Sequence, residues 1–313
     1  IGGIKTIEQE IDYGDILQFV FYINLLTWPF ASIGWVTSLI QRAAASQKRI
    51  NEFLDKNEKI NVIHDSKKIS QIHSISFENV SFTYEQTNIE ALKNVSFKLS
   101  TGQTLGIIGK TGSGKSTVAS LLSRLYDPNI GNLYINGINL SKINLENIRS
   151  KIGYVPQDVF LFSDTIKNNI LFGIHSDTVE NERIIKAAID AHIHEDIIQF
   201  PNGYETVVGE RGVTLSGGQK QRISIARALI RNPELLILDD CLSAVDTSTE
   251  NRIQNNLKPL LKKSISIVIG HRISSVSSCD CIIVFENGEI AEQGDHRQLL
   301  KNKKIYYEIY QNN

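Results

Sequence analysis

Cysteine and methionine are scarce in this sequence of 313 residues. It has three cysteines, Cys241, Cys279 and Cys281, and no methionine. An odd number of cysteines without regular spacing argues against a disulfide framework and favours a reducing compartment. The pair Cys279 and Cys281 has no second pair with which to hold zinc, so we expect all three to be packing residues. Because the sequence starts at Ile1 without methionine, we expect it to be part of a longer protein.

An excess of charge of either sign is also lacking. The chain has 33 basic and 34 acidic residues, a formal net charge of −1. The composition, 41% hydrophobic and 21% charged, is that of a globular protein with one or two domains. No basic excess indicates a nucleic-acid partner, and we expect none.

Charged residues are absent altogether from Ile16 to Ile40. An uncharged run of this length can cross the hydrocarbon core of a bilayer as a helix. Pro29 lies near its middle, and a proline kink is tolerated in a membrane helix. The alternative is a buried helix of a soluble protein, but the run is longer than such helices usually are.

The charges that flank this run differ in sign. Acidic residues precede it, whereas basic residues follow it: Glu8, Glu10, Asp12 and Asp15 before, Arg42, Lys48, Arg49, Lys56 and Lys59 after. A signal peptide would carry its positive charges in front. Because positive charge is retained on the cytoplasmic side, everything after Ile40 is expected in the cytoplasm. The helix itself is expected to lie in a cell membrane or inner membrane of the bacterial type.

Three regions follow from this pattern. Residues 1–55 are predicted to be the end of a membrane domain, with a helix over about 16–40 that continues into the cytoplasm, since 42–55 has helix formers and no breaker. Residues 56–68 are polar and aperiodic, which is typical of a linker. Residues 69–313 are predicted to form a soluble domain, with short β-like runs from about Ile69. One membrane helix alone is an anchor and not a transport pathway.

A glycine-rich turn lies between a predicted strand and a predicted helix, from Thr104 to Leu122. Gly109, Gly114, Lys115 and Ser116 have the P-loop spacing, in which glycines let successive backbone N–H groups face phosphate oxygens. The start of the helix adds its positive end, and the Ser116 hydroxyl suits Mg²⁺. The predicted phosphate-binding residues are Gly109, Lys110, Thr111, Gly112, Ser113, Gly114, Lys115, Ser116 and Thr117. A kinase, a GTPase or a motor would carry this motif as well.

Two carboxylates follow the apolar run Leu235 to Leu238. Such a run predicts a parallel strand that is buried on both faces, so Asp239 and Asp240 are expected where the strand leaves the core. Ligands bind at the carboxyl ends of strands in open α/β sheets. Asp239 is therefore a candidate Mg²⁺ ligand, and Asp240 a candidate acceptor for the proton of an attacking water. The alternative is a strand end capped by solvated acids.

A second motif identifies which P-loop protein the chain resembles. Leu215, Ser216, Gly217, Gly218 and Gln219 match the signature of ATP-binding-cassette (ABC) ATPases. Ser216 is a good helix N-cap, and the two glycines expose amides at a helix start, which makes a second anion site. The resemblance implies an α/β P-loop NTPase fold with an antiparallel β subdomain and an α-helical signature subdomain, preceded by a transmembrane helix.

The same resemblance assigns further residues. It implies that Tyr84 stacks on adenine, Gln157 senses Mg²⁺ and the water, and His271 senses the γ-phosphate. Asp246 matches the end of the loop, residues 243–246, that joins two ATP sites across a dimer. The stretch Thr206 to Gly212 resembles the exporter subgroup.

The resemblance is close over residues 69–313 and looser towards the N-terminus, which looks like the last helix of an exporter of the multidrug or lipid type. In this family two cassettes meet head to tail. Ser216, Gly217, Gly218 and Gln219 of one chain are then expected to contact ATP held by the other. The implied ligands are ATP and Mg²⁺, and the implied partners are a second half-transporter, membrane lipid and an export substrate that the sequence does not identify.

One residue departs from the family pattern: Asp240 stands where Glu is usual. Its shorter side chain is expected to slow hydrolysis. In heterodimeric exporters of this family one subunit often carries such an Asp, so the resemblance favours a slow site in a heterodimer. Gln157, His271 and the signature are intact, which leaves open a homodimer in which Asp240 works through a shifted water. A regulatory subunit that hydrolyses little ATP is a second interpretation. A soluble ABC ATPase of DNA repair is a third, which the short stretch from Ser116 to Leu215 disfavours.

Overall fold

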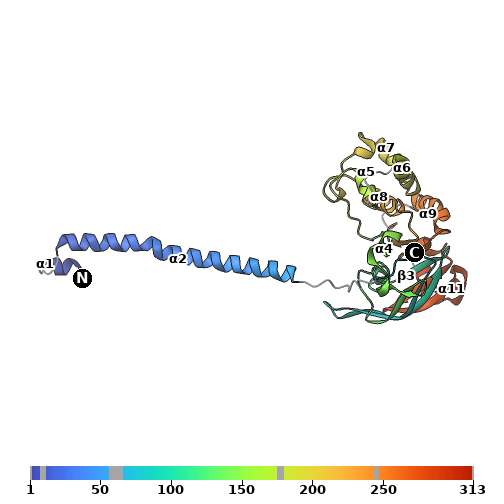
Figure 1. Cartoon of the computed structure of the whole chain (residues 1–313), viewed down its shortest axis with the longest axis horizontal. Coiled ribbons are helices and arrows are strands. Elements are labelled where there is room, and N and C mark those ends of the chain that lie inside the picture. The colour runs from blue at the N-terminus through green and yellow to red at the C-terminus, as the bar shows by residue number, and fades with distance from the viewer. Residues whose placement is uncertain (1, 8–11, 56–65, 175–179, 243–246, 312–313) are drawn as a thin grey trace. The chain divides into compact units, whose positions relative to one another are not determined.

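The computed structural model of the chain describes residues 2–7, 12–55, 66–174, 180–242 and 247–311. It divides into two compact units, Ile1–Lys59 and Ile60–Asn313 (Figure 1).

The first unit is helical. A short helix α1 (Gly2–Ile7) precedes α2 (Tyr13–Leu54), which has 42 residues and continues through Pro29. Asp12 caps α2: its side chain accepts from the backbone N–H of the third helical residue, Asp15, whose carboxylate in turn accepts from the Asp12 N–H. α2 thus covers both the predicted helix, about 16–40, and the stretch after it as one element.

Uncharged polar side chains in α2 bond to their own helix. The side chains of Asn24, Thr27 and Thr37 donate to the carbonyl oxygens four residues before them, at 3.0, 2.9 and 2.7 Å. Polar groups in a bilayer must be satisfied internally in this way. None of the residues of α2 is buried within the structure. Among the described residues, α2 is the one helix long and apolar enough to cross a membrane.

The second unit contains two β-sheets. The first has four strands, all antiparallel, in the order β2-β1-β4-β5. The second has six strands in the order β10-β9-β3-β8-β7-β6, in which only the β9–β10 pair is antiparallel. The strands are β1 (Ser74–Tyr84), β2 (Ile89–Ser100), β3 (Thr104–Gly109), β4 (Ile130–Ile135), β5 (Ile138–Asn139), β6 (Ile152–Val155), β7 (Leu235–Asp239), β8 (Ile265–Ile269), β9 (Cys281–Glu286) and β10 (Glu289–Gly294).

Most helices of this unit lie in the chain between strands, and two of them, α11 and α12, follow the last strand, β10. Four of them, α5 to α8, gather in one region between β6 and β7 in the chain order (Figure 1). The α-helices are α3 (Lys115–Leu122), α4 (Leu145–Lys151), α5 (Ile166–Leu171), α6 (Asn181–Asp190), α7 (His194–Gln199), α8 (Gly217–Leu229), α9 (Thr247–Leu261), α10 (Ile273–Val276), α11 (His296–Asn302) and α12 (Ile305–Gln311), with 3-10 turns η1 (Leu140–Lys142), η2 (Gly203–Glu205) and η3 (Glu210–Gly212).

The core lies on both faces of the larger sheet. Leu235 and Ile237 of β7 pack in one cluster with the antiparallel sheet and α3, whereas Leu236 and Leu238 pack in another with α5 to α9. All five residues of β7 are buried. Fully burying each such Leu or Ile side chain contributes about 1.5–3 kcal/mol. This two-sided burial makes β7 a stiff support for the carboxylates at its end.

The predicted fold class is confirmed: a P-loop α/β domain with an antiparallel sheet and a helical region, preceded by a long helix. Two details differ from expectation. The first strand begins at Ser74, not near Ile69, because residues 66–73 are held mainly by side-chain contacts. Lys67, inside the predicted linker, already pairs with Ile143. Residues 56–65 lie outside the described residues.

Candidate nucleotide site

The P-loop joins β3 to α3 as predicted. Gly114 has a φ of 99° immediately before Lys115, the first residue of α3, a conformation that L-residues with a Cβ rarely adopt. A Cβ at Gly114 would lie 2.2 Å from the Ala91 carbonyl oxygen, and one at Gly109 would lie 2.2 Å from that of Phe285. The loop therefore requires glycine at both positions, and its backbone is held close to its neighbours.

Lys115 lies over the loop that it follows. Its Nζ donates to the carbonyl oxygens of Gly109 and Lys110, each at 2.8 Å. Burial lowers the pKa of Lys115, while the charges of Asp240 and Asp239 act in the opposite direction. The ammonium group is thus fixed at the mouth of the loop with two carboxylates nearby.

Asp239 is the last residue of β7 and is only 2% exposed. Asp239 and Asp240 lie where the strand ends, as expected, but Asp239 is buried there, because hydrogen bonds compensate for its burial. Ser116 Oγ donates to Asp239 Oδ1 at 3.0 Å and the Tyr154 hydroxyl donates to Oδ2 at 3.4 Å. Burial nevertheless raises the pKa of Asp239, and the charge of Asp240 adds to this. A cation beside the Asp239 and Ser116 oxygens would relieve that cost, and oxygen donors are those that Mg²⁺ prefers.

Asp240 has left the strand and lies among three strand ends. Its backbone N–H donates to Ile269 O at 2.8 Å, and its φ of 47° is a conformation in which Asp is enriched. Asp240 Oδ1 lies 2.8 Å from Nδ1 of His271, and Oδ2 accepts from Gln157 Nε2 at 3.3 Å. The carboxylate thus joins Gln157, after β6, to His271, after β8.

These groups face one cavity of about 520 Å³. Tyr84 stands in its wall: the Tyr84 hydroxyl is 3.2 Å from Thr117 Oγ1 and its ring meets Phe82 and Tyr126 edge-on. Gly109, Lys110 and Ser113 belong to the loop but not to the lining. The predicted residues that line the cavity are Tyr84, Thr111, Gly112, Gly114, Lys115, Ser116, Thr117, Gln157, Asp239, Asp240 and His271.

The signature residues form a separate site at the start of α8. Ser216 caps this helix: its Oγ accepts from the Gln219 N–H at 3.2 Å, and Gln219 Oε1 accepts from the Ser216 N–H at 3.1 Å. Gln219 Nε2 also donates to Asp196 Oδ1 at 3.0 Å. Ser216 and Gly217 are exposed and Gly218 is half-buried. None of the four lines the P-loop cavity.

Two residues remain, Asp246 and Tyr154. Asp246, predicted to lie in the loop between two ATP sites, is outside the described residues. Tyr154 was not anticipated: nothing in the sequence marks it as a donor to Asp239, because the contact depends on β6 pairing with β7, where Tyr154 is opposite Ile237.

The comparisons with known proteins agree with this geometry. Residues 92–243 match the family model described as ABC transporter. The chain is 42% identical to a probable multidrug resistance ABC transporter ATP-binding/permease protein, YheI, of Bacillus subtilis, over 99% of this chain and 53% of that protein. It is 43% identical to an ATP-dependent lipid A-core flippase of Haemophilus ducreyi, over 98% of this chain and 52% of that protein.

A solved structure is similar over nearly the whole chain. It is that of a bacterial Atm1-family ABC exporter with ATP bound, with a TM-score of 0.80 and 34% identity, covering 97% of this chain and 53% of that one. The chain therefore spans about half the length of the relatives it matches. With the P-loop and signature in the positions described, the chain carries the ATP-binding domain of the ABC transporter family, preceded by a long N-terminal helix.

Proposed function

We propose that residues 69–313 bind and hydrolyse ATP as one half of an ABC exporter, and that residues 1–55 are the end of its membrane domain, joined by the linker 56–68. The observation that carries this proposal is the convergence of the P-loop, Asp239, Asp240, Gln157 and His271 on one cavity. The multidrug and lipid A relatives support an export function.

The P-loop residues 109–117 are assigned to the phosphates and Tyr84 to the adenine ring. The loop amides and Lys115 neutralise phosphate charge, and α3 adds its positive end. Ser116, Asp239 and Gln157 are the residues that would hold Mg²⁺, which when bound neutralises charge on the β- and γ-phosphates. In the present geometry Ser116 and Asp239 are already hydrogen-bonded to each other.

Hydrolysis is assigned to Asp240, Gln157 and His271. Water attacks the γ-phosphorus, the bond to the β–γ bridging oxygen breaks, and Asp240 accepts the water's proton, giving ADP and phosphate. Gln157 orients the water and His271 contacts the γ-phosphate. The contacts of Asp240 with both residues support their acting together.

A partner is needed because the two nucleotide-binding elements of one chain lie apart. Ser216, Gly217, Gly218 and Gln219 would close over ATP held by a second half-transporter, with Asp246 in the loop between the two sites. Asp240 in place of Glu favours a heterodimer, in which this P-loop forms the slower site and this signature completes the faster one. A homodimer would place Asp240 in both sites.

The membrane assignment comes from α2. An apolar helix followed by basic residues supports an integral membrane protein with its ATP-binding domain in the cytoplasm. Lipid would surround α2, and ATP-driven pairing of the domains would alternate the membrane helices between two states.

The proposal is tested on the intact transporter in lipid vesicles by measuring phosphate release with and without Mg²⁺. We expect Mg²⁺-dependent hydrolysis that Lys115→Ala abolishes together with tight ATP binding. Brisk hydrolysis by a strict monomer with Ser216 and Gly217 replaced by alanine would contradict it.

A second candidate function is a regulatory half that holds ATP and hydrolyses almost none. The short Asp240 side chain, held by His271 at 2.8 Å, favours this alternative. Single-turnover hydrolysis at this site separates the two: an ATP lifetime of many catalytic cycles of the transporter favours the regulatory role.

A further inference from the structure

The chain reaches the first strand of the ATP-binding domain through a short segment that is firmly held. Residues 66–73, here called the connector, form neither helix nor strand apart from the single bridge of Lys67 to Ile143. Ile69 and Ile72 of the connector are 7% and 3% exposed. They belong to the same apolar cluster as Ile152 and Leu235, which begin β6 and β7. The connector is thus packed onto the domain at the start of these two strands.

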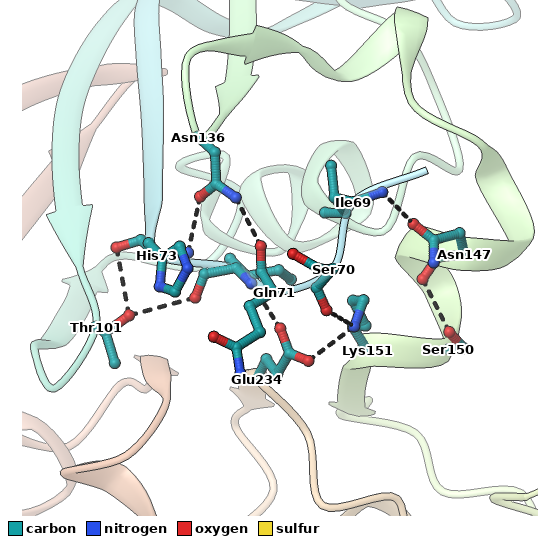
Figure 2. A network of polar contacts seen from close by, with 11 residues as sticks. Ile69, Ser70, Gln71, His73, Thr101, Asn136, Asn147, Ser150, Lys151 and Glu234 are labelled. Atoms are coloured by element: carbon teal, nitrogen blue, oxygen red, sulfur yellow. Dashed lines mark hydrogen bonds and ion pairs between the residues drawn. The ribbon is translucent and has the colours of Figure 1, made fainter. Parts of the chain in front are cut away.

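An ion pair ties the connector to both strand starts (Figure 2). Lys151, directly before β6, and Glu234, directly before β7, are 2.8 Å apart between Nζ and Oε1. Lys151 Nζ also donates to the Ser70 carbonyl oxygen, and Glu234 Oε2 accepts from the Ile72 N–H. The side chains are 16% and 30% exposed, so solvent screens this pair less than a surface pair. One charge pair therefore bonds to two connector residues.

Asn136 holds the connector from another side (Figure 2). Its Oδ1 accepts from the N–H groups of His73 at 2.7 Å and Ser74 at 3.0 Å, and its Nδ2 donates to Gln71 O at 2.6 Å. Asn136 lies in the turn between β4 and β5 with a φ of 53°. The side chain of Asn136 thus bonds to two connector residues and to the first residue of β1.

Two strands link these contacts to the nucleotide site. β6 and β7 run parallel from the connector to the cavity, so the strands that follow Lys151 and Glu234 lead to Gln157 and Asp239 in the cavity lining. β7 is buried throughout, and packed interiors transmit displacement with little compression. On its other side the connector continues, by chain connectivity, towards α2.

We propose that the connector and its three partners, Lys151, Glu234 and Asn136, form a latch that couples the nucleotide site to α2. The three are positioning residues: they keep the connector and the starts of β6 and β7 together, so that rearrangement at Gln157 and Asp239 is passed to the chain leading to α2. This inference rests on the proposed function.

The first test exchanges the charges of the pair. In the double variant Lys151→Glu, Glu234→Lys the opposite charges still face each other, but a lysine cannot accept from the Ile72 N–H and a carboxylate cannot donate to Ser70 O. The intact transporter in lipid is studied by hydrogen–deuterium exchange, nucleotide-free and with Mg²⁺, ATP and vanadate. In the unchanged protein we expect ATP to alter exchange in both 109–117 and 42–54. In the double variant we expect the change at 109–117 to persist and that at 42–54 to be lost.

The second test leaves the ion pair in place. Asn136→Gly keeps the positive φ of the turn and removes only the side chain. Asn287→Gly is the matched control, because Asn287 holds the equivalent place in the β9–β10 turn, with a φ of 50° and a following glycine. We expect Asn136→Gly to speed exchange of the His73 and Ser74 amides by roughly 2- to 10-fold per hydrogen bond lost, and to weaken the response at 42–54. The control should behave as the unchanged protein does.

The results distinguish the latch from the proposed function. Absence of any ATP effect at 109–117 in the unchanged protein would contradict the proposed function itself. An ATP effect at 109–117 without one at 42–54 in the unchanged protein overturns the latch alone. So does a response at 42–54 that survives both the charge exchange and Asn136→Gly. If the charge exchange prevents folding, Asn136→Gly decides the question.

Discussion

Lengthening Asp240 by one methylene is the most direct test of how this site hydrolyses ATP. Asp240 now bonds to His271 at 2.8 Å and to Gln157 at 3.3 Å. In Asp240→Glu the carboxylate can advance by about 1–1.5 Å, the length of one C–C bond. That places it closer to a water at the γ-phosphate, while Gln157 and His271 stay on their strand ends.

The size of the effect follows from the cost of misplacement. An error of about 1 Å in a reacting group can lower a rate about 100-fold, so Asp240→Glu is expected to raise kcat by up to about two orders of magnitude with little change in KM. Initial rates of phosphate release against Mg²⁺-ATP concentration measure both. Asp240→Asn, which removes the proton acceptor, should lower kcat and serves as the control.

The same substitution should reduce stability slightly. With a φ of 47°, residue 240 has a conformation that Asp tolerates better than Glu. A penalty of about 0.5–1 kcal/mol corresponds to a fall in Tm of about 1–4 °C for a domain of this size. A fall in steady-state ATPase activity after Asp240→Glu, with Tm lowered no further than this, would refute the view that the short side chain limits hydrolysis.

Three further outcomes are expected. Lys115→Ala should abolish tight ATP binding in equilibrium titrations, whereas Lys98→Ala, an exposed lysine of β2, should not change it. Ser216→Ala should destabilise the domain by about 0.5–2 kcal/mol through loss of the α8 cap and also lower turnover, while Ser216→Asn, which restores a cap, should recover only the stability in urea denaturation. Asp196 responds to pH: burial raises its pKa, but hydrogen bonds from Arg222 and Gln219 and the Arg222 charge outweigh this, so its folded-state pKa is lowered. Its contribution to stability is therefore present above about pH 3.9 and lost as pH falls through the lower folded value, and Asp196→Asn should flatten the dependence of unfolding free energy on pH below about 4. An unchanged slope would mean that the pair with Arg222 contributes nothing to stability.

Local sequence predicted those parts of the molecule whose structure depends on neighbours in the chain. The glycine pattern before Lys115 predicted the P-loop because positive φ and close backbone contacts require glycine there. Ser216 predicted the start of α8 because an N-cap bonds only to backbone groups of the first turn that follows it. The uncharged run from Ile16 predicted α2 because the length of the run and its lack of charge are read from consecutive residues.

Contacts across the chain could not be predicted in this way. Asp239 is buried because Ser116 and Tyr154, far from it in sequence, bring hydroxyl groups to its oxygens. A carboxylate after an apolar run carries no mark of such partners. Residues 66–68 of the connector were predicted as the end of a linker, because their polarity is evident in the sequence. Their neighbours in the fold are not evident: Lys151 and Glu234, the partners of the connector, come together only when β6 pairs with β7.

The cap at the start of α8 uses the oxygen of the Ser216 hydroxyl as an acceptor and does not use its proton. Ser216 Oγ uses a lone pair to accept from the Gln219 N–H. A serine hydroxyl has two lone pairs and one proton, and the proton takes no part in that bond. Ser216 can therefore keep the cap of α8 and at the same time donate to a phosphate oxygen, so the proposed contact with the nucleotide of a second chain would leave the cap intact.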